Sequence, residues 1–117
     1  MEIKTCYEKM GANYENAFIR LQNEALIVKA ARIFKGDQNY LLLKEALEKK
    51  DVEQAFFACH TLKGMCLNLG FTQLTEGGLF ELNELLRSKT LEGTEKLMDQ
   101  LDPIYQRTMD SLKELED

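Results

Sequence analysis

The stretch "DVEQAFFACHTLKGMCLNLG", residues 51–70, decides the fold and contains the only histidine of the chain, His60. Asp51 is a residue type that caps the start of a helix, and Gln54 follows at the spacing of a capping box. Gly70 can end a helix in a left-handed conformation. These signals predict one helix that begins after Asp51 and ends at Gly70.

This predicted helix has one apolar face and one mixed face, because successive residues are turned by about 100°. The apolar face collects Ala55, Ala58, Leu62, Met65, Cys66 and Leu69. The mixed face collects Phe56, Phe57, His60, Lys63, Gly64 and Leu67. Since the apolar face can fill a bundle core by itself, we expect His60 to point outward.

The segment before this helix, residues 23–50, also has helical periodicity. Its apolar positions are Leu26, Ala30, Ile33, Tyr40, Leu41 and Leu47. They predict one long helix. A glycine costs about 1 kcal/mol in a helix interior, so a kink or break at residues 35–37, around Gly36, stays open as an alternative.

The segment after Gly70 predicts a further helix up to about Lys89, with Thr72 as its cap. Its periodic apolar residues are Leu74, Leu82, Leu85 and Leu86. Gly77 and Gly78 fall inside this helix and weaken it. We expect them to mark a close approach of a neighbouring helix, because such a loss must be offset by contact.

The last segment is amphipathic and contains the only proline, Pro103. Its apolar residues are Leu97, Leu101, Ile104, Met109, Leu112 and Leu115. We expect a helix with a kink at Pro103, while two shorter helices, the second beginning at Asp102 and Pro103, are the other option.

Together these segments predict an all-α fold. No stretch alternates in the manner of a strand, and helices joined by short connections pack as antiparallel neighbours. We therefore expect an antiparallel up-down four-helix bundle, with a short extra N-terminal helix around residues 14–20 that covers one end.

Composition narrows the class of protein. With 117 residues, of which 44% are hydrophobic, residues 1–117 suit a single domain. A net charge of −5 argues against a nucleic-acid partner. The first residues, "MEIKTCYEKM", lack the apolar run of a signal peptide, and no window reaches the roughly 18 apolar residues of a membrane span, so we expect a cytoplasmic protein that binds no membrane. The odd number of cysteines suits free thiols in a reducing compartment.

The spacing of His60, Lys63 and Gly64 suits phosphate chemistry. Lys63 places an ammonium group beside anything that the imidazole carries, and Gly64 removes the side chain that would crowd it. A neutral imidazole is a good nucleophile, and a phosphoryl group on its nitrogen is a compact anion. A lone histidine is usually an ordinary surface or core residue, but these neighbours favour a phosphate carrier.

The sequence "AFFACHTLKGMCLNLG", residues 55–70, resembles the signature of histidine phosphotransfer (HPt) domains: a small residue before H-x-L-K-G, then a Leu-Gly pair. The order of helices along most of the chain is also similar to that family. The resemblance implies a four-helix bundle that passes a phosphoryl group between aspartates of response-regulator receiver domains. It implies that His60 is the phosphoacceptor, that Lys63 stabilises the phosphate, and that Gly64 gives access to the histidine.

The sequence departs from the family pattern at a few positions. Many members have glutamate or glutamine 22 residues after the histidine, where this chain has Leu82, and whether Glu81 or Asn83 assists His60 instead is open. Phe57 stands where a polar residue is common and enlarges the apolar surface beside His60. We expect the receiver to dock on Phe56, Phe57 and Leu67, although neighbouring helices can bury one or both phenylalanines.

Other functions have weaker support in the sequence. Cys59, His60 and Cys66 diverge around the helix, so we expect no metal site. The resemblance implies that the chain has no resident cofactor and that the receiver supplies the Mg²⁺. Motifs of hydrolases and ATP sites are absent, which argues against hydrolytic and kinase activity. The resemblance implies a phosphoryl carrier rather than an enzyme. The alternative is a helical adaptor that docks a receiver without carrying phosphate. A third option is the phosphotransfer module of a sensor kinase, although Met1 and Asp117 favour a free-standing protein. One candidate partner is the receiver of a hybrid sensor histidine kinase.

Overall fold

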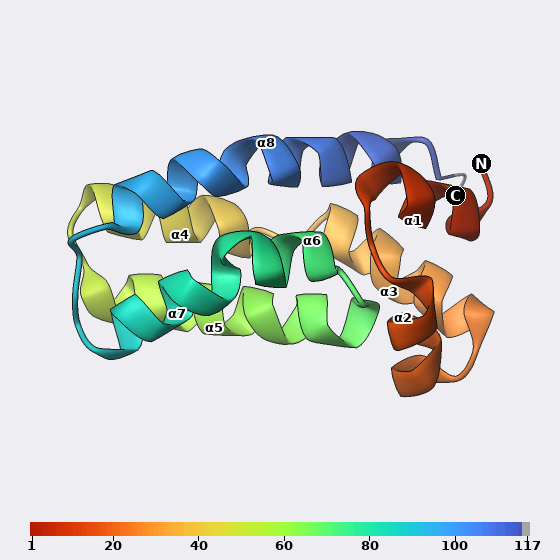
Figure 1. The fold of residues 1–117 in the computed structure, drawn as a ribbon, viewed down its shortest axis with the longest axis horizontal. Coiled ribbons are helices and arrows are strands. Elements are labelled where there is room, and N and C mark those ends of the chain that lie inside the picture. Colours follow the sequence, from red (N-terminus) through yellow and green to blue (C-terminus); the bar gives the residue numbers. More distant parts are fainter. Residues whose placement is uncertain (116–117) are drawn as a thin grey trace.

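The computed structural model describes residues 1–115, and these residues form helices and no strands. The elements are α1 Ile3–Met10, α2 Tyr14–Leu21, α3 Glu24–Lys35, α4 Asn39–Glu48, α5 Val52–Leu69, α6 Thr72–Leu74, the π-helical turn η1 Thr75–Leu79, α7 Phe80–Arg87 and α8 Thr94–Lys113. The long elements run antiparallel along one axis, and α1 and α2 lie at one end (Figure 1). The predicted all-α bundle is confirmed.

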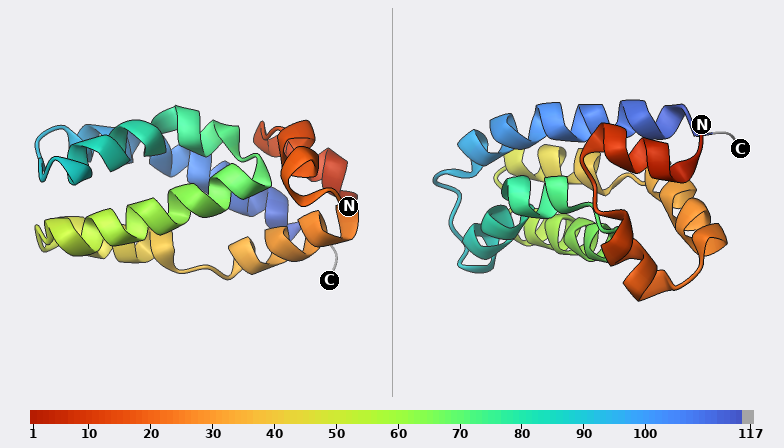
Figure 2. Two further views of the ribbon diagram at one scale, coloured as in Figure 1. Left: turned by 90° about the horizontal axis from the view of Figure 1, so that it is seen from below. Right: turned by 45° about the vertical axis from the view of Figure 1, so that its right-hand side comes forward.

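Helix α5 has the ends that the sequence predicts. The Asp51 carboxylate accepts a hydrogen bond of 3.1 Å from the Gln54 backbone N–H. Gly70 ends the helix with a φ of +67°, and its carbonyl accepts a hydrogen bond of 2.7 Å from the Asn13 N–H. Figure 2 (left) shows α5 in front, with α3 and α4 on one side and α6 and α7 on the other.

The prediction of one long helix over residues 23–50 is wrong, and the alternative of a break at Gly36 is confirmed. The Asp37 carboxylate accepts a hydrogen bond of 2.9 Å from the backbone N–H of Asn39, the first residue of α4. Contacts with α8 then hold α4, because the Tyr40 ring stacks on Tyr105 at 3.8 Å and its hydroxyl donates to the Asp102 carboxylate. Tertiary contacts therefore stabilise the break.

The prediction of close packing at the glycine pair is confirmed. A Cβ atom on Gly77 would lie 2.8 Å from Ile104 Cδ1, and one on Gly78 would lie 2.9 Å from Leu101 Cγ. The predicted helix is interrupted here by η1, in which Gly78 has a φ of +155°. The prediction of Thr72 as a cap is wrong, because the helix begins at Thr72 after the buried Phe71.

The last helix, α8, continues through Pro103, so the option of two shorter helices is wrong. Proline has no backbone N–H, so it leaves one carbonyl of the preceding turn without its usual partner. Pro103 is exposed, so water can bond to that carbonyl.

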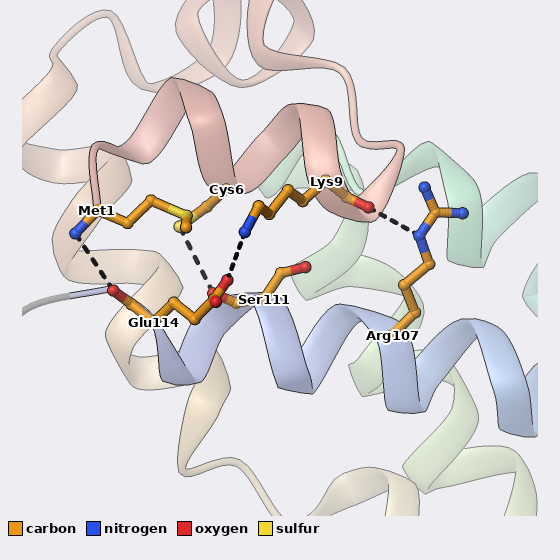
Figure 3. Close-up of polar contacts among 6 residues, drawn as sticks. All are labelled: Met1, Cys6, Lys9, Arg107, Ser111 and Glu114. Atoms are coloured by element: carbon orange, nitrogen blue, oxygen red, sulfur yellow. Dashed lines mark hydrogen bonds and ion pairs between the residues drawn. The ribbon is translucent and has the colours of Figure 1, made fainter.

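The N-terminal region contains two helices where the sequence predicts one. The predicted helix around residues 14–20 corresponds to α2, and α1 precedes it. Figure 3 shows how polar contacts tie α1 to α8. They join Cys6 Sγ to the Ser111 carbonyl at 3.5 Å, Lys9 Nζ to Glu114 Oε2 at 3.1 Å, Arg107 Nε to the Lys9 carbonyl at 2.7 Å, and the Met1 amino group to the Glu114 carbonyl at 3.3 Å. These partners lie about a hundred residues apart in the sequence, so helical periodicity cannot predict the contacts between them.

Candidate functional site

His60 lies on the outer face of α5, as its place on the helix predicts. The opposite face fills the core: Ala55, Ala58, Leu62, Cys66 and Leu69 are buried, and Met65 is half-buried. Cys59 is buried as well, at the edge where α5 meets the glycine pair. The core therefore does not depend on the histidine, and the imidazole is open to a partner.

Helix α7 adds a cation to the site that sequence reasoning missed. The His60 ring stacks on Phe56, with centroids 5.5 Å apart and an interplanar angle of 22°. The guanidinium carbon of Arg87, at the end of α7, lies 5.3 Å from the centroid of the same Phe56 ring. Arg87 Nε also donates to Glu84 Oε2 at 3.2 Å. The helical periodicity of α5 cannot reveal Arg87, because tertiary packing alone brings it to Phe56.

Lys63 and Gly64 follow His60 on the same helix. Both are half-buried, and Lys63 stands at the i+3 position, where helix neighbours meet. A Cβ atom on Gly64 would have no heavy atom within 4 Å outside its own helix. This glycine therefore serves no close packing inside the bundle, and the space beside His60 is open.

The position 22 residues after the histidine, which is glutamate or glutamine in many HPt domains, holds a core residue in this chain. Leu82 is buried, Glu81 is exposed, and Asn83 is buried. Both polar side-chain atoms of Asn83 lack a hydrogen-bond partner within the described residues. Of the two neighbours left open by the sequence, Asn83 is the buried one and Glu81 faces solvent.

The three predicted docking residues differ in exposure. Phe57 is 69% exposed, whereas Phe56 and Leu67 are half-buried. Phe57 shares a hollow with the exposed Leu42 of α4, and Leu67 shares another with the exposed Ile19 of α2. Apolar surface thus extends from the His60 face toward both neighbouring helices.

A comparison with models of protein families identifies the family of the chain. The model of the Hpt domain matches residues 36–115. The chain belongs to the Hpt domain family. Membership of this family assigns the chain a phosphotransfer function in a phosphorelay. No curated protein and no solved structure matches the chain. Helices α1, α2 and α3 lie before the segment that the Hpt domain model matches.

The cysteines of this Hpt domain are free thiols in the core. Burial raises the pKa of the Cys59 thiol to about 12, with a smaller opposing effect of the Lys63 ammonium group. Burial also raises the pKa of the Cys66 thiol. Within residues 1–115, no three His, Cys, Asp or Glu side chains gather in a way that holds a metal ion. No helix in that range is both long and apolar enough to cross a membrane.

Proposed function

We propose that this Hpt domain carries a phosphoryl group on His60 and exchanges it with aspartates of response-regulator receiver domains. The observation that carries the proposal is an exposed imidazole with Lys63 at i+3 and open space beside Gly64. The family match supports it, because phosphoryl transfer is the activity of Hpt domains.

The chemistry requires little of the bundle itself. The unprotonated imidazole nitrogen attacks phosphorus, a P–N bond forms, the P–O bond of the aspartyl phosphate breaks, and the carboxylate leaves. Lys63 stabilises the negative charge on the phosphoryl oxygens. The receiver supplies the aspartate and the Mg²⁺, so the chain acts as a carrier and needs neither an ATP site nor a cofactor of its own.

A direct experiment tests this function. The chain is incubated with phosphorylated receiver domains, including that of a hybrid sensor histidine kinase, and then examined for acid-labile, base-stable phosphate. We expect such phosphate on His60. Stable binding of receivers without any transfer would overturn the carrier and favour the adaptor that docks a receiver without carrying phosphate.

Gly64→Gln tests whether access to His60 depends on this glycine. We expect slower phosphoryl transfer, because the new side chain projects beside the imidazole. The free energy of unfolding should stay unchanged or rise by up to about 1 kcal/mol, since glutamine favours the helix and the space is empty. Transfer rates and thermal denaturation measure the two effects. Gly36→Gln, in the exposed break between α3 and α4, is the control, and equal transfer rates in both variants would contradict the assignment.

Phe57→Ala tests the docking surface. Aromatic anchors in an interface are each worth about 2 kcal/mol or more, so we expect the dissociation constant for the receiver to rise more than tenfold. Stability should barely change, because the ring is 69% exposed. Titration calorimetry against a receiver measures the affinity, with Phe18→Ala of α2 as an exposed phenylalanine control. Intact affinity together with a lower melting temperature would place Phe57 in the core and move the docking surface elsewhere.

A further inference from the structure

A large cavity lies at the end of the bundle that α1 and α2 form, and none of the residues assigned to phosphoryl transfer lines it. Its volume is about 850 Å³, and it is wide open to solvent. Its lining residues fall between Lys4 and Glu24, whereas the Hpt domain model matches residues 36–115. The cavity therefore belongs to the part of the chain that precedes the matched segment.

Aromatic and aliphatic side chains form the apolar part of this cavity. The ring of Tyr14 packs edge-on against the buried ring of Tyr7, with centroids 5.4 Å apart, and its centroid lies 6.3 Å from that of Phe18. Phe18 is 46% exposed and Ile19 is 69% exposed. Exposed apolar side chains that lie together in this way mark binding sites. The two tyrosines thus give the cavity a packed wall, and Phe18 and Ile19 offer apolar surface for a partner to cover.

The rim of the cavity is acidic. Glu8 of α1, Glu15 of α2 and Glu24 of α3 line it, and all three are exposed. Within residues 1–115, none of these three carboxylates forms an ion pair with a lysine or arginine side chain. Among the lining residues, Lys4 is the one cation. Three carboxylates therefore face a single ammonium group.

Lys4 shows how the cavity accommodates a cation. Its Nζ atom lies 5.3 Å from the centroid of the Tyr14 ring, within the range of a cation–π interaction. The Tyr14 hydroxyl donates a hydrogen bond of 2.8 Å to Glu24 Oε1, which orients the ring. Lys4 is exposed, so its ammonium group can leave the ring for water. The ring and the carboxylates thus form a place for an ammonium or guanidinium group, which a residue of the chain itself now holds.

We propose that this cavity binds a basic amphipathic segment of a partner protein. Apolar side chains of the segment cover Phe18 and Ile19, and one of its arginines or lysines takes the place of Lys4 on the Tyr14 ring. The excess of carboxylates selects a basic partner, and the net charge of −5 attracts it. A small ligand is usually enclosed over most of its surface, whereas a peptide segment can lie across a cavity as open as this one. The site is independent of phosphoryl transfer on His60.

The experiment uses the full chain and a synthetic peptide as probe. The peptide is a helix of leucine and lysine about four turns long, with the lysines on one face and a single tryptophan. The chain contains no tryptophan, so tryptophan fluorescence reports on the peptide alone. We expect saturable binding that weakens as salt is added, and no binding of a matched peptide with glutamate in place of lysine. In NMR spectra, the resonances of Tyr14, Phe18 and Ile19 should shift, and those of His60 should not.

Variants locate the peptide in the cavity. Tyr14→Leu should raise the dissociation constant about fivefold, because the cation–π interaction is lost. Glu15→Gln should raise it about threefold, while Glu53→Gln, which changes an equally exposed glutamate in the first turn of α5, should not. Lys4→Met frees the ring and should lower the dissociation constant about threefold. Lys9→Met, at an exposed lysine of α1 that does not line the cavity, should leave it unchanged.

Three results would overturn the proposal. The first is the absence of saturable binding, or equal effects of each cavity variant and its control, since attraction to an acidic chain in general would then explain the binding. The second is binding of tetramethylammonium alone as tightly as the peptide, which would make this a site for small organic cations. The third is self-association in sedimentation that Glu15→Gln abolishes, which would place a second copy of the chain in the cavity. Lys4 and Glu15 are exposed, so loss of folding does not obscure these comparisons.

Discussion

His60→Gln is expected to accept no phosphate from a phosphorylated receiver, a loss of at least about 10³-fold in transfer rate. An amide nitrogen is not a nucleophile, so the variant has no atom on which the P–N bond can form. The free energy of unfolding should stay within about 0.5 kcal/mol of wild type, because the ring is exposed and the apolar face of α5 fills the core without it. Transfer of radiolabelled phosphate and thermal denaturation measure the two quantities.

This variant also separates the carrier from the adaptor. The receiver should still bind, since Phe56, Phe57 and Leu67 are unchanged. A variant that binds the receiver and blocks a reconstituted phosphorelay supports the carrier. A relay that runs unimpaired with His60→Gln would assign the chain to docking alone, and a variant that unfolds would show His60 to be a structural residue.

Gly70→Ala is expected to lower the free energy of unfolding by about 3 kcal/mol or more, the largest stability effect of a single methyl group that we predict. Gly70 has a φ of +67°, where a side chain costs about 1 to 2 kcal/mol. The added Cβ atom would also lie 2.2 Å from the Asn13 carbonyl oxygen and 3.0 Å from the Ala17 backbone nitrogen. These are backbone atoms, so α2 would have to move as a unit and would lose the hydrogen bond from Asn13 N–H to the Gly70 carbonyl.

Gly11→Ala provides a matched control for this prediction. Gly11 has a similar φ of +77°, but a Cβ atom there meets only Gln73 Cβ at an ordinary 3.9 Å. We expect this variant to lose only the conformational contribution, about 1 kcal/mol. Chemical denaturation of both variants measures the difference. Equal losses of unfolding free energy in the two variants would mean that α2 shifts easily and that the close approach at Gly70 does not add to the destabilisation.

The sequence by itself determined the central helix and the face that carries the histidine. Asp51 and Gly70 act on helix ends through hydrogen bonds to residues within one turn, and the apolar face follows from the helical repeat. These are local interactions, so their residues lie together in the sequence and can be recognised there. His60, Lys63 and Gly64 also lie within about one helical turn of each other, so they form a single motif that can be recognised in the sequence.

Tertiary structure alone decided the features that depend on residues far apart in the chain. The break at Gly36 is held by contacts of Tyr40 with Tyr105, and α1 by contacts with the end of α8. Arg87 reaches Phe56 only because α7 packs antiparallel to α5. Such contacts depend on how helices meet in three dimensions, and the periodicity of a single helix contains no information about the register of its neighbour.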